Sequence, residues 1–165
     1  MRSRLKLDRL YLRILSMLQR NARITNQELA DAVGLSPSPC LERVRKLERE
    51  GYVRGYRAEL DLERLGSTVT VYTLVALGSH DQARFERFEH TVASLPQIVE
   101  CAKVSGSFDY LLRWVCRSVS EYHRLSDRLL AGAAGATLTS HIVLEHTRPF
   151  SGYPLEHLFE PQPDA

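Results

Sequence analysis

Basic and small polar side chains share one face of a short segment in the first third of the chain. From Cys40 to Glu50, apolar residues recur three and four positions apart, as in an amphipathic helix, and Arg45, Lys46 and Arg49 fall on the opposite side. Guanidinium and ammonium groups bind phosphate oxygens, so this face predicts contact with a polyanion such as DNA. A charged face that only meets water is the alternative, and the neighbouring sequence decides between the two.

The residues around this segment specify a second helix and a tight turn. Thr25 and Glu28 form a Thr-x-x-Glu capping box, in which each residue's side chain accepts a hydrogen bond from the other's amide. Gly34 can adopt the left-handed conformation that ends this helix. Ser36 and Ser38 each precede a proline, and either serine can cap the next helix. The two helices are therefore predicted to form a helix-turn-helix unit that presses its second helix into a DNA groove.

Flanking segments are expected to support this unit. Leu7 to Asn21 reads as an amphipathic helix that would complete a three-helix core. Gly51 to Arg57 reads as two extended stretches, either a wing or an exit strand beside the groove. We expect eight residues to meet bases or phosphates, and the arginines at 43, 54 and 57 would chiefly hold the DNA backbone. These residues are Ser36, Ser38, Arg43, Arg45, Lys46, Arg49, Arg54 and Arg57.

Charge is divided unevenly along the 165 residues. Residues 1–60 contain 13 Lys and Arg against 7 Asp and Glu, a net charge of +6, and residues 61–165 contain 9 against 13, a net charge of −4. A basic half joined to an acidic half is typical of a nucleic-acid-binding module attached to a module with another task. No apolar run resembles a signal peptide or approaches membrane-spanning length, so we expect a cytoplasmic protein with no membrane partner.

Cysteines and histidines give no sign of a metal centre. Cys40, Cys101 and Cys116 lie in stretches that read as regular structure and lack the spacing of zinc ligands, so buried, reduced thiols are predicted. His141 and His146 are five residues apart on one predicted strand and would point to opposite faces. We therefore expect no metal, no other cofactor and no catalytic residue.

The second half of the sequence twice repeats a strand, a helix and a strand. The predicted strands are 69–77, 98–104, 110–117 and 138–144, and the predicted helices are 81–95 and one capped by Ser118 and Glu121. Two such repeats are the split β-α-β arrangement of a ferredoxin-like sandwich. We therefore predict an α+β protein with a helix-turn-helix domain at 1–62, a βαββαβ domain at 63–148 and a tail at 149–165.

Both faces of the predicted sheet are apolar. In the first strand, Val71 and Val75 on one side alternate with Tyr72 and Leu74 on the other, whereas a sheet face in contact with water would be polar. A second copy of the chain is the simplest cover for the face without helices, and the C-terminal tail is the alternative. In a twofold dimer, two recognition helices would read an inverted-repeat DNA site.

A short loop between the second and third strands has the chemistry of a small-molecule site. Gly106 would let the backbone approach a ligand, the amides beside it suit a carboxylate, and Asp109 could pair with an ammonium group. Those are the two charged ends of an amino acid. The same Gly-x-x-Asp spacing is also typical of a plain hairpin turn.

Ordered motifs along most of the chain resemble the Lrp/AsnC, or feast/famine, transcription regulators. In the first half these are Leu7-Asp8, Ala22-Arg23-Ile24-Thr25, Gly34-Leu35-Ser36-Pro37-Ser38-Pro39-Cys40 and Arg43-Val44-x-x-Leu47-Glu48-x-x-Gly51. In the second half they are Leu95-Pro96-x-Ile98, Gly106-Ser107-Phe108-Asp109-Tyr110 and Thr137-Leu138-Thr139-Ser140. The resemblance runs from about residue 7 to about residue 147.

The resemblance implies a winged helix-turn-helix domain followed by a RAM-type effector domain, with double-stranded DNA and an amino acid or related metabolite as partners. It implies homodimers and assemblies up to tetramers or octamers, with the effector site at a contact between dimers. The family's common Gly-Asp-Tyr-Asp is Gly-Ser-Phe-Asp here, and Tyr11 stands where the family usually has an acidic residue. The implied effector residues are Gly106, Ser107, Phe108, Asp109, Thr137, Thr139 and Ser140.

We therefore expect a sequence-specific transcription regulator that is not an enzyme and whose DNA affinity or assembly responds to an effector. Two other functions use the same modules. A sirohaem decarboxylase resembling Lrp would need basic residues and histidines around a tetrapyrrole cleft, and would purify with a visible-absorbing cofactor. A nucleoid-structuring protein would bind random duplex as well as any specific site in competition at fixed salt.

Overall fold

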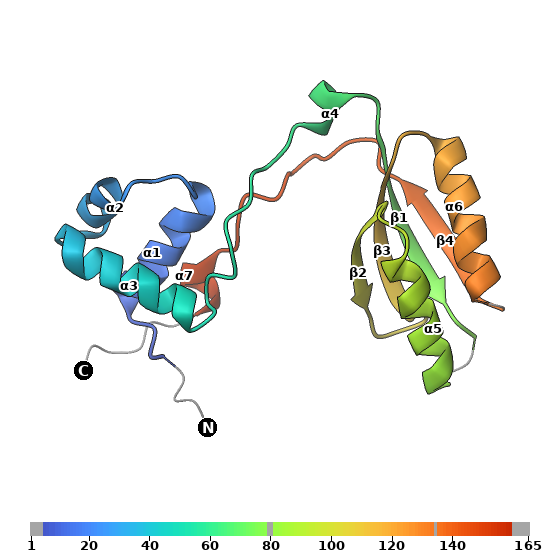
Figure 1. The fold of residues 1–165 in the computed structure, drawn as a ribbon, viewed down its shortest axis with the longest axis horizontal. Helices are drawn as coiled ribbons and strands as arrows, with labels where there is room; N and C mark the ends of the chain where they lie inside the picture. Colours follow the sequence, from blue (N-terminus) through green and yellow to red (C-terminus); the bar gives the residue numbers. More distant parts are fainter. Residues whose placement is uncertain (1–4, 79–80, 134, 160–165) are drawn as a thin grey trace. The chain divides into compact units, whose positions relative to one another are not determined.

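The computed structural model describes residues 5–78, 81–133 and 135–159. The chain forms two compact units (Figure 1). The first unit runs to Glu59 and resumes at Arg148, and the second unit is Leu60–Thr147. The chain therefore passes between the units twice, because the C-terminal tail returns to the unit in which the chain began. No helix among the described residues is long and apolar enough to cross a membrane.

Three helices form the body of the first unit. They are α1 (Arg9–Arg20), α2 (Asn26–Val33) and α3 (Pro37–Arg49). Asp8 starts α1 because its carboxylate accepts a hydrogen bond from the Tyr11 amide at 2.8 Å, so the helix begins two residues after the predicted start. Ile14 on α1 and Cys40 and Leu47 on α3 have no exposed surface, and they belong to one apolar core.

The turn between α2 and α3 follows the local signals of the sequence. Thr25 and Glu28 complete both halves of the capping box, and Gly34 ends α2 with a φ of 74°. Ser36 is the N-terminal cap of α3, although its side chain caps no amide, and Pro37 is the first helical residue. This choice between Ser36 and Ser38 was open in the sequence.

The described part of the C-terminal tail, up to residue 159, packs on α1. It contains a one-turn helix, α7 (Leu155–Leu158), which contacts α1. The Gln19 side chain on α1 makes two hydrogen bonds to Tyr153: Nε2 donates to the carbonyl oxygen at 2.7 Å, and Oε1 accepts from the amide at 2.9 Å. Gly152 allows this approach, because its φ is 108° and a Cβ there would lie 2.9 Å from Gln19 Cδ. The tail, one of the two expected covers for the open sheet face, is thus docked within the first unit.

The second unit has the predicted βαββαβ order. After a one-turn helix, α4 (Leu62–Leu65), its elements are β1 (Val69–Ala76), α5 (Gln82–Ala93), β2 (Ile98–Lys103), β3 (Tyr110–Cys116), α6 (Val119–Gly132) and β4 (Thr137–Ile142). The sheet is antiparallel with strand order β2-β3-β1-β4, and α5 and α6 cover one of its faces (Figure 1). The predicted α+β fold and ferredoxin-like sandwich are confirmed. Strand β4 ends at Ile142, where its pairing with β1 ends, two residues before the predicted end.

The register of the sheet sorts side chains between the two faces. Val71, Thr73 and Val75 of β1 are fully buried beneath the helices, together with Trp114 of β3, which pairs with Val71. Their alternate neighbours in β1 and β3 are only half-buried in the single chain. The apolar residues of this open face are Tyr72, Leu74, Leu111 and Val115.

Candidate DNA-binding surface and effector site

Helix α3 presents three of its predicted cations to solvent. Arg45, Lys46 and Arg49 are exposed, as is Ser38 in the first turn, while Leu47 on the opposite side is fully buried. Lys46 and Arg49 lie in the last turn of the helix, where the negative end of the helix dipole also stabilises cations. None of the three cations forms an ion pair with a described residue. The face is therefore free to bind an external anion.

Hydrogen bonds fix the turn that leads into α3. The Nδ2 atom of Asn26 donates to the Pro37 carbonyl oxygen at 2.9 Å, which joins the first residue of α2 to the first residue of α3. The Glu28 carboxylate accepts from the Thr25 amide at 2.9 Å and from the Thr25 hydroxyl at 2.8 Å. These bonds, the amide first, lower the pKa of Glu28, so the capping box is charged at neutral pH. The start of α3 is thereby held to α2.

Arg43 differs from the other cations of α3. It lies three residues after Cys40 and four before Leu47, which are both fully buried, so it begins on the inner side of the helix. Its Nη1 donates to Asp8 Oδ2 at 2.7 Å, and its guanidinium carbon lies 4.4 Å from the centre of the Tyr11 ring. The structure therefore places this predicted DNA contact against α1. No spacing in the sequence points to the pair.

The segment after α3, expected as a wing or an exit strand, forms neither a helix nor a strand over residues 54–61. Arg54 and Arg57 are exposed on it. The Tyr56 hydroxyl donates to Glu48 Oε1 at 2.9 Å and so attaches the segment to α3. Desolvation, with this bond and the negative charge of Glu48, raises the pKa of Tyr56 to about 12. The two arginines are thus carried on a segment that α3 anchors.

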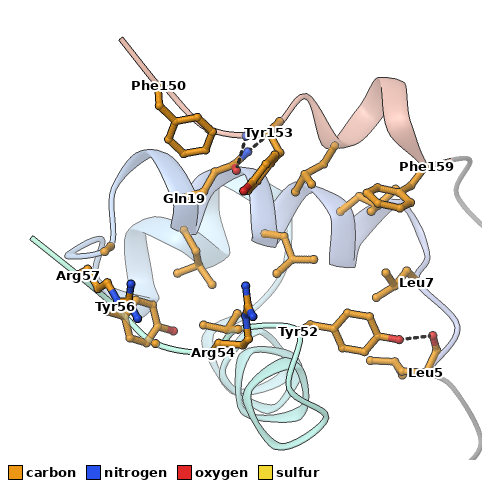
Figure 2. A pocket seen from close by; sticks show the side chains of 18 residues that line it. Leu5, Leu7, Gln19, Tyr52, Arg54, Tyr56, Arg57, Phe150, Tyr153 and Phe159 are labelled. Carbon is orange, nitrogen blue, oxygen red and sulfur yellow. Dashed lines mark hydrogen bonds between the residues drawn. The ribbon is translucent and has the colours of Figure 1, made fainter. Parts of the chain in front are cut away.

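A groove of about 1170 Å³ lies in the first unit between α1, residues 52–57 and the tail. Figure 2 shows Phe150, Tyr153 and Phe159 on the tail side and Tyr52 on the opposite side. Most of the lining is apolar, and its charged members are Arg54 and Arg57. Apart from these two arginines, the groove contains none of the predicted site residues.

The loop predicted to bind an effector joins β2 to β3. Gly106 and Ser107 are exposed, and Gly106 has a φ of 115°, while Phe108 and Asp109 are half-buried. The Asp109 carboxylate Oδ2 accepts from the Leu77 amide at 2.7 Å. This carboxylate therefore already helps to hold the end of β1, a role that the hairpin spacing did not reveal.

The three predicted effector residues on β4 divide between the two faces of the sheet. Thr137 and Thr139 pair with Ala76 and Leu74 on the open face, and both are exposed. Ser140 is on the helix face, where its hydroxyl hydrogen-bonds to the Tyr122 hydroxyl and lies 3.3 Å from Thr73 Oγ1. The structure thus brings the two threonines to the open side of the sheet and separates Ser140 from them.

The histidines and cysteines that the structure describes form no metal-binding group. Among the described residues, no cluster of three or more His, Cys, Asp or Glu side chains could hold a metal ion. Cys40 and Cys116 are buried free thiols, as predicted, but Cys101 is exposed because it lies on the edge strand β2. Burial raises the pKa of the Cys40 and Cys116 thiols, with the negative charge of Glu121 adding to the effect at Cys116. Partial desolvation and the negative charge of Glu89 raise the pKa of the Cys101 thiol, so all three thiols are protonated at neutral pH.

Family models match both parts of the chain. A winged helix-turn-helix DNA-binding model matches residues 7–54, and the Lrp/AsnC ligand binding domain model matches residues 70–151. The exposed cationic helix and these matches together define a helix-turn-helix DNA-binding protein joined to a ligand-binding domain.

Relatives and solved structures agree with this class. The transcriptional regulatory protein DoeX of Halomonas elongata is 41% identical over 79% of this chain and 83% of its own length. The leucine-responsive regulatory protein of Escherichia coli strain K12 is 41% identical over 86% of this chain and 87% of its own length. An AsnC family transcriptional regulator from Agrobacterium tumefaciens superposes with a TM-score of 0.84 at 32% identity, covering 93% of this chain and all of that one.

A transcriptional regulator from Neisseria meningitidis, solved in complex with L-Met, also superposes with a TM-score of 0.84 at 32% identity, covering 93% of this chain and 99% of that one. The chain belongs to the Lrp/AsnC family, and it is a DNA-binding transcriptional regulator with a ligand-binding domain.

Proposed function

We propose that this regulator recognises specific DNA sites through α3 and that an amino acid or related metabolite modulates its affinity for them. The observation that carries the proposal is the exposed face of α3, where Arg45, Lys46 and Arg49 have no ion-pair partner among the described residues. Side chains on such a helix can reach base edges and phosphates in the major groove. Arg43 is set apart from this group because Asp8 already engages its guanidinium.

The remaining predicted contacts flank this face. Ser36 and Ser38 lie at the N-terminus of α3, where the positive end of the helix dipole favours a phosphate, and Ser36 caps no amide of its own helix. Arg54 and Arg57 lie on the exposed segment after α3 and would hold the backbone beside the groove. Phosphate contacts of this kind position the protein without reading sequence, so discrimination is assigned to α3.

The effector site is proposed at the loop Gly106, Ser107, Phe108 and Asp109, with Thr137 and Thr139 on the open face. The exposed, positive-φ Gly106 leaves the backbone accessible to a carboxylate. The Neisseria meningitidis relative in complex with L-Met supports an amino acid as the ligand class. A typical coupling of about 1–3 kcal/mol between effector and DNA would change DNA affinity by roughly 5- to 150-fold.

Ser140, which belonged to the predicted effector set, has a different role in this proposal. Its hydroxyl is engaged by Tyr122 and Thr73 on the helix face. We assign it to holding β4 against α6, from which position it would support Thr139 without touching the ligand.

A homodimer through the open sheet face completes the proposal. Tyr72, Leu74, Leu111 and Val115 are half-buried and apolar there, and the described part of the tail packs on α1 instead. A second copy would bury them and pair two α3 helices about a twofold axis. Tetramers and octamers would extend this dimer.

Competition binding tests specificity. Labelled operator DNA, selected from random duplex, is displaced by unlabelled operator and by random duplex at one salt concentration. A regulator of specific sites should prefer operator by about a thousandfold or more. A ratio near one would instead favour a protein that coats DNA.

Thermal shift with each of the twenty amino acids tests the effector. A true ligand raises the melting temperature, because it stabilises the folded state by RT ln(1 + [L]/Kd), where [L] is the free ligand concentration. Asp109→Asn keeps an oxygen for the Leu77 amide and removes the negative charge, so it should weaken the shift caused by an amino acid while preserving the sheet. An undiminished shift in this variant would remove Asp109 from the ligand contacts.

A further inference from the structure

One carboxylate in the first unit fixes two helices. Oδ1 of Asp8 accepts from the Tyr11 amide at 2.8 Å and starts α1, and Oδ2 accepts from Arg43 Nη1 at 2.7 Å in the middle of α3. The Arg43 guanidinium also lies over the Tyr11 ring, with its carbon 4.4 Å from the ring centre. Asp8, Tyr11 and Arg43 therefore form a single bracket between α1 and α3.

The bracket is partly shielded from water. The Arg43 and Asp8 side chains are 27% and 16% exposed. A charge-assisted hydrogen bond in such a site is stronger and less sensitive to salt than a pair on an open surface. Arginine can donate to a carboxylate and stack on an aromatic ring at once because its guanidinium is planar, whereas the lysine ammonium is a point charge with no plane to stack. To reach a phosphate, Arg43 would first have to leave both contacts.

The position of Arg43 on α3 also indicates a contact with α1 and not with DNA. Arg43 shares the inner side of α3 with Cys40 and Leu47, which have no exposed surface, whereas Lys46 and Arg49 are exposed. The bracket is also the only ion pair among the described residues that joins α1 to α3. Loss of it would leave the angle between these helices to apolar packing and to the hydrogen bonds of the turn.

We propose that Arg43 is a positioning residue for DNA recognition, which with Asp8 and Tyr11 holds α3 at the angle at which its exposed cations meet DNA, and that it neutralises no phosphate itself. The inference rests on the proposed role of α3 as the recognition helix. In the parent protein the binding-competent orientation is the populated one. When the bracket is lost, that fraction falls, and the apparent Kd rises in inverse proportion.

Asp8→Asn is the decisive variant, because the two roles of Arg43 predict opposite results. Asparagine keeps an oxygen for the Tyr11 amide, so α1 retains its cap, but the charge that holds Arg43 is gone. An arginine that bound phosphate would be released from its competitor, and DNA binding would tighten or stay the same. A positioning arginine would lose its anchor, so fewer molecules would hold α3 in the orientation that binds DNA. If that fraction fell to about one tenth, the apparent Kd would rise about tenfold.

Arg43→Lys tests the other side of the bracket. It keeps the positive charge and removes the fork that both donates and stacks, so it should weaken binding to a similar extent. The combined Asp8→Asn and Arg43→Lys variant should bind no worse than either single variant, because both changes break one contact. Circular dichroism at the assay temperature checks that each variant is folded. Any variant that is not folded is replaced by Tyr11→Leu, which leaves the cap of α1 intact and removes the aromatic ring.

The salt dependence of binding gives a readout that a change of fold stability does not move. All bracket variants should keep the parent's slope of log K against log salt, because the number of phosphate contacts is unchanged. Lys46→Ala serves as the matched control, and its slope should be about 0.9 smaller in magnitude than the parent's because one phosphate contact is lost.

Two results would overturn the positioning role. One is Asp8→Asn binding DNA as tightly as the parent or more tightly. The other is a salt slope about 0.9 smaller in magnitude in Arg43→Gln, which removes the positive charge and would thereby reveal a lost phosphate contact. Failure of the recognition role of α3 is a separate outcome: Lys46→Ala and Arg49→Ala would then both match the parent in affinity and in slope.

Discussion

Replacing Lys46 and Arg49 with alanine should weaken DNA binding chiefly by removing counterion release. Both side chains are exposed in the last turn of α3 and pair with no described acid, so each can neutralise one phosphate. Each lost contact reduces the slope of log K against log salt by about 0.9, so the double variant loses about 1.8. From about 50 to about 200 mM salt, the parent should then lose about twelvefold more affinity than the variant does.

Fluorescence anisotropy with one labelled duplex, at four or more salt concentrations, measures both slopes. Arg87→Ala with Arg128→Ala is the matched control, because it removes two exposed arginines from α5 and α6 and changes the net charge equally. The control should keep the parent's slope. If the Lys46 and Arg49 variant also kept it, those side chains would not contact phosphate; if the control lost as much slope, the effect would reflect net charge alone.

Three further changes test other parts of the structure. Gly152→Ala should detach the tail, because a φ of 108° disfavours alanine and the new Cβ would lie 2.9 Å from Gln19 Cδ. The resulting strain of about 1–3 kcal/mol should appear as faster amide hydrogen exchange in the tail. Hydrogen bonds from Arg117 lower the pKa of Glu121 below its ordinary value of 4.5. The ionised carboxylate therefore stabilises the folded state fully above that pH, and this stabilisation is lost as pH falls through the pKa of the folded state. Glu121→Gln should make the free energy of unfolding less dependent on pH in this acid range. Leu74→Asp should place a charge on the open sheet face and yield a monomer in sedimentation.

Each of these changes has an outcome that would contradict it, and the tail variant also has a matched control. Ser151→Ala, at an exposed neighbour in the tail, should leave tail exchange unchanged, and equal protection in the Gly152 variant would deny the docking constraint. Trp114, the single tryptophan, is buried in the second unit and so reports unfolding there by fluorescence. An unaltered acid profile in Glu121→Gln would mean that another carboxyl dominates. A dimer that survived Leu74→Asp would have to form through a different surface.

Most of the fold could be predicted because its signals are local. The capping box of Thr25 and Glu28, the stop at Gly34 and the cap at Ser118 each act over three or four residues, and the structure has all of them. Apolar periodicity likewise predicted the order of strands and helices in the second unit. Errors occurred at element ends, as at α1, where the Asp8 cap rather than the first apolar residue sets the start, and in the segment after α3, which forms no strand over residues 54–61.

The candidate sites likewise could be predicted where they depend on local spacing and could not where they depend on contacts between distant residues. The exposed side of α3 follows from helical spacing alone, since Arg45, Lys46 and Arg49 oppose a buried stripe. Because successive side chains of a strand point to opposite faces, the sequence could have placed Ser140 and Thr139 on different faces. It could not show which of these faces the helices cover, which the structure shows through the contacts of Tyr122 on α6 with Thr73 and Ser140. The hairpin spacing could not show that the Asp109 carboxylate holds the Leu77 amide.

The sequence by itself therefore determined the helix-turn-helix unit, the βαββαβ order and the cationic face, because caps and periodicity depend on residues a few positions apart. Only the tertiary structure decided where Arg43, Ser140 and the tail lie. Their contacts join residues 35, 67 and 134 positions apart, as in Arg43 with Asp8, Ser140 with Thr73, and Tyr153 with Gln19. Such pairs form because apolar burial brings whole helices and strands together, and polar groups caught between them must then find partners.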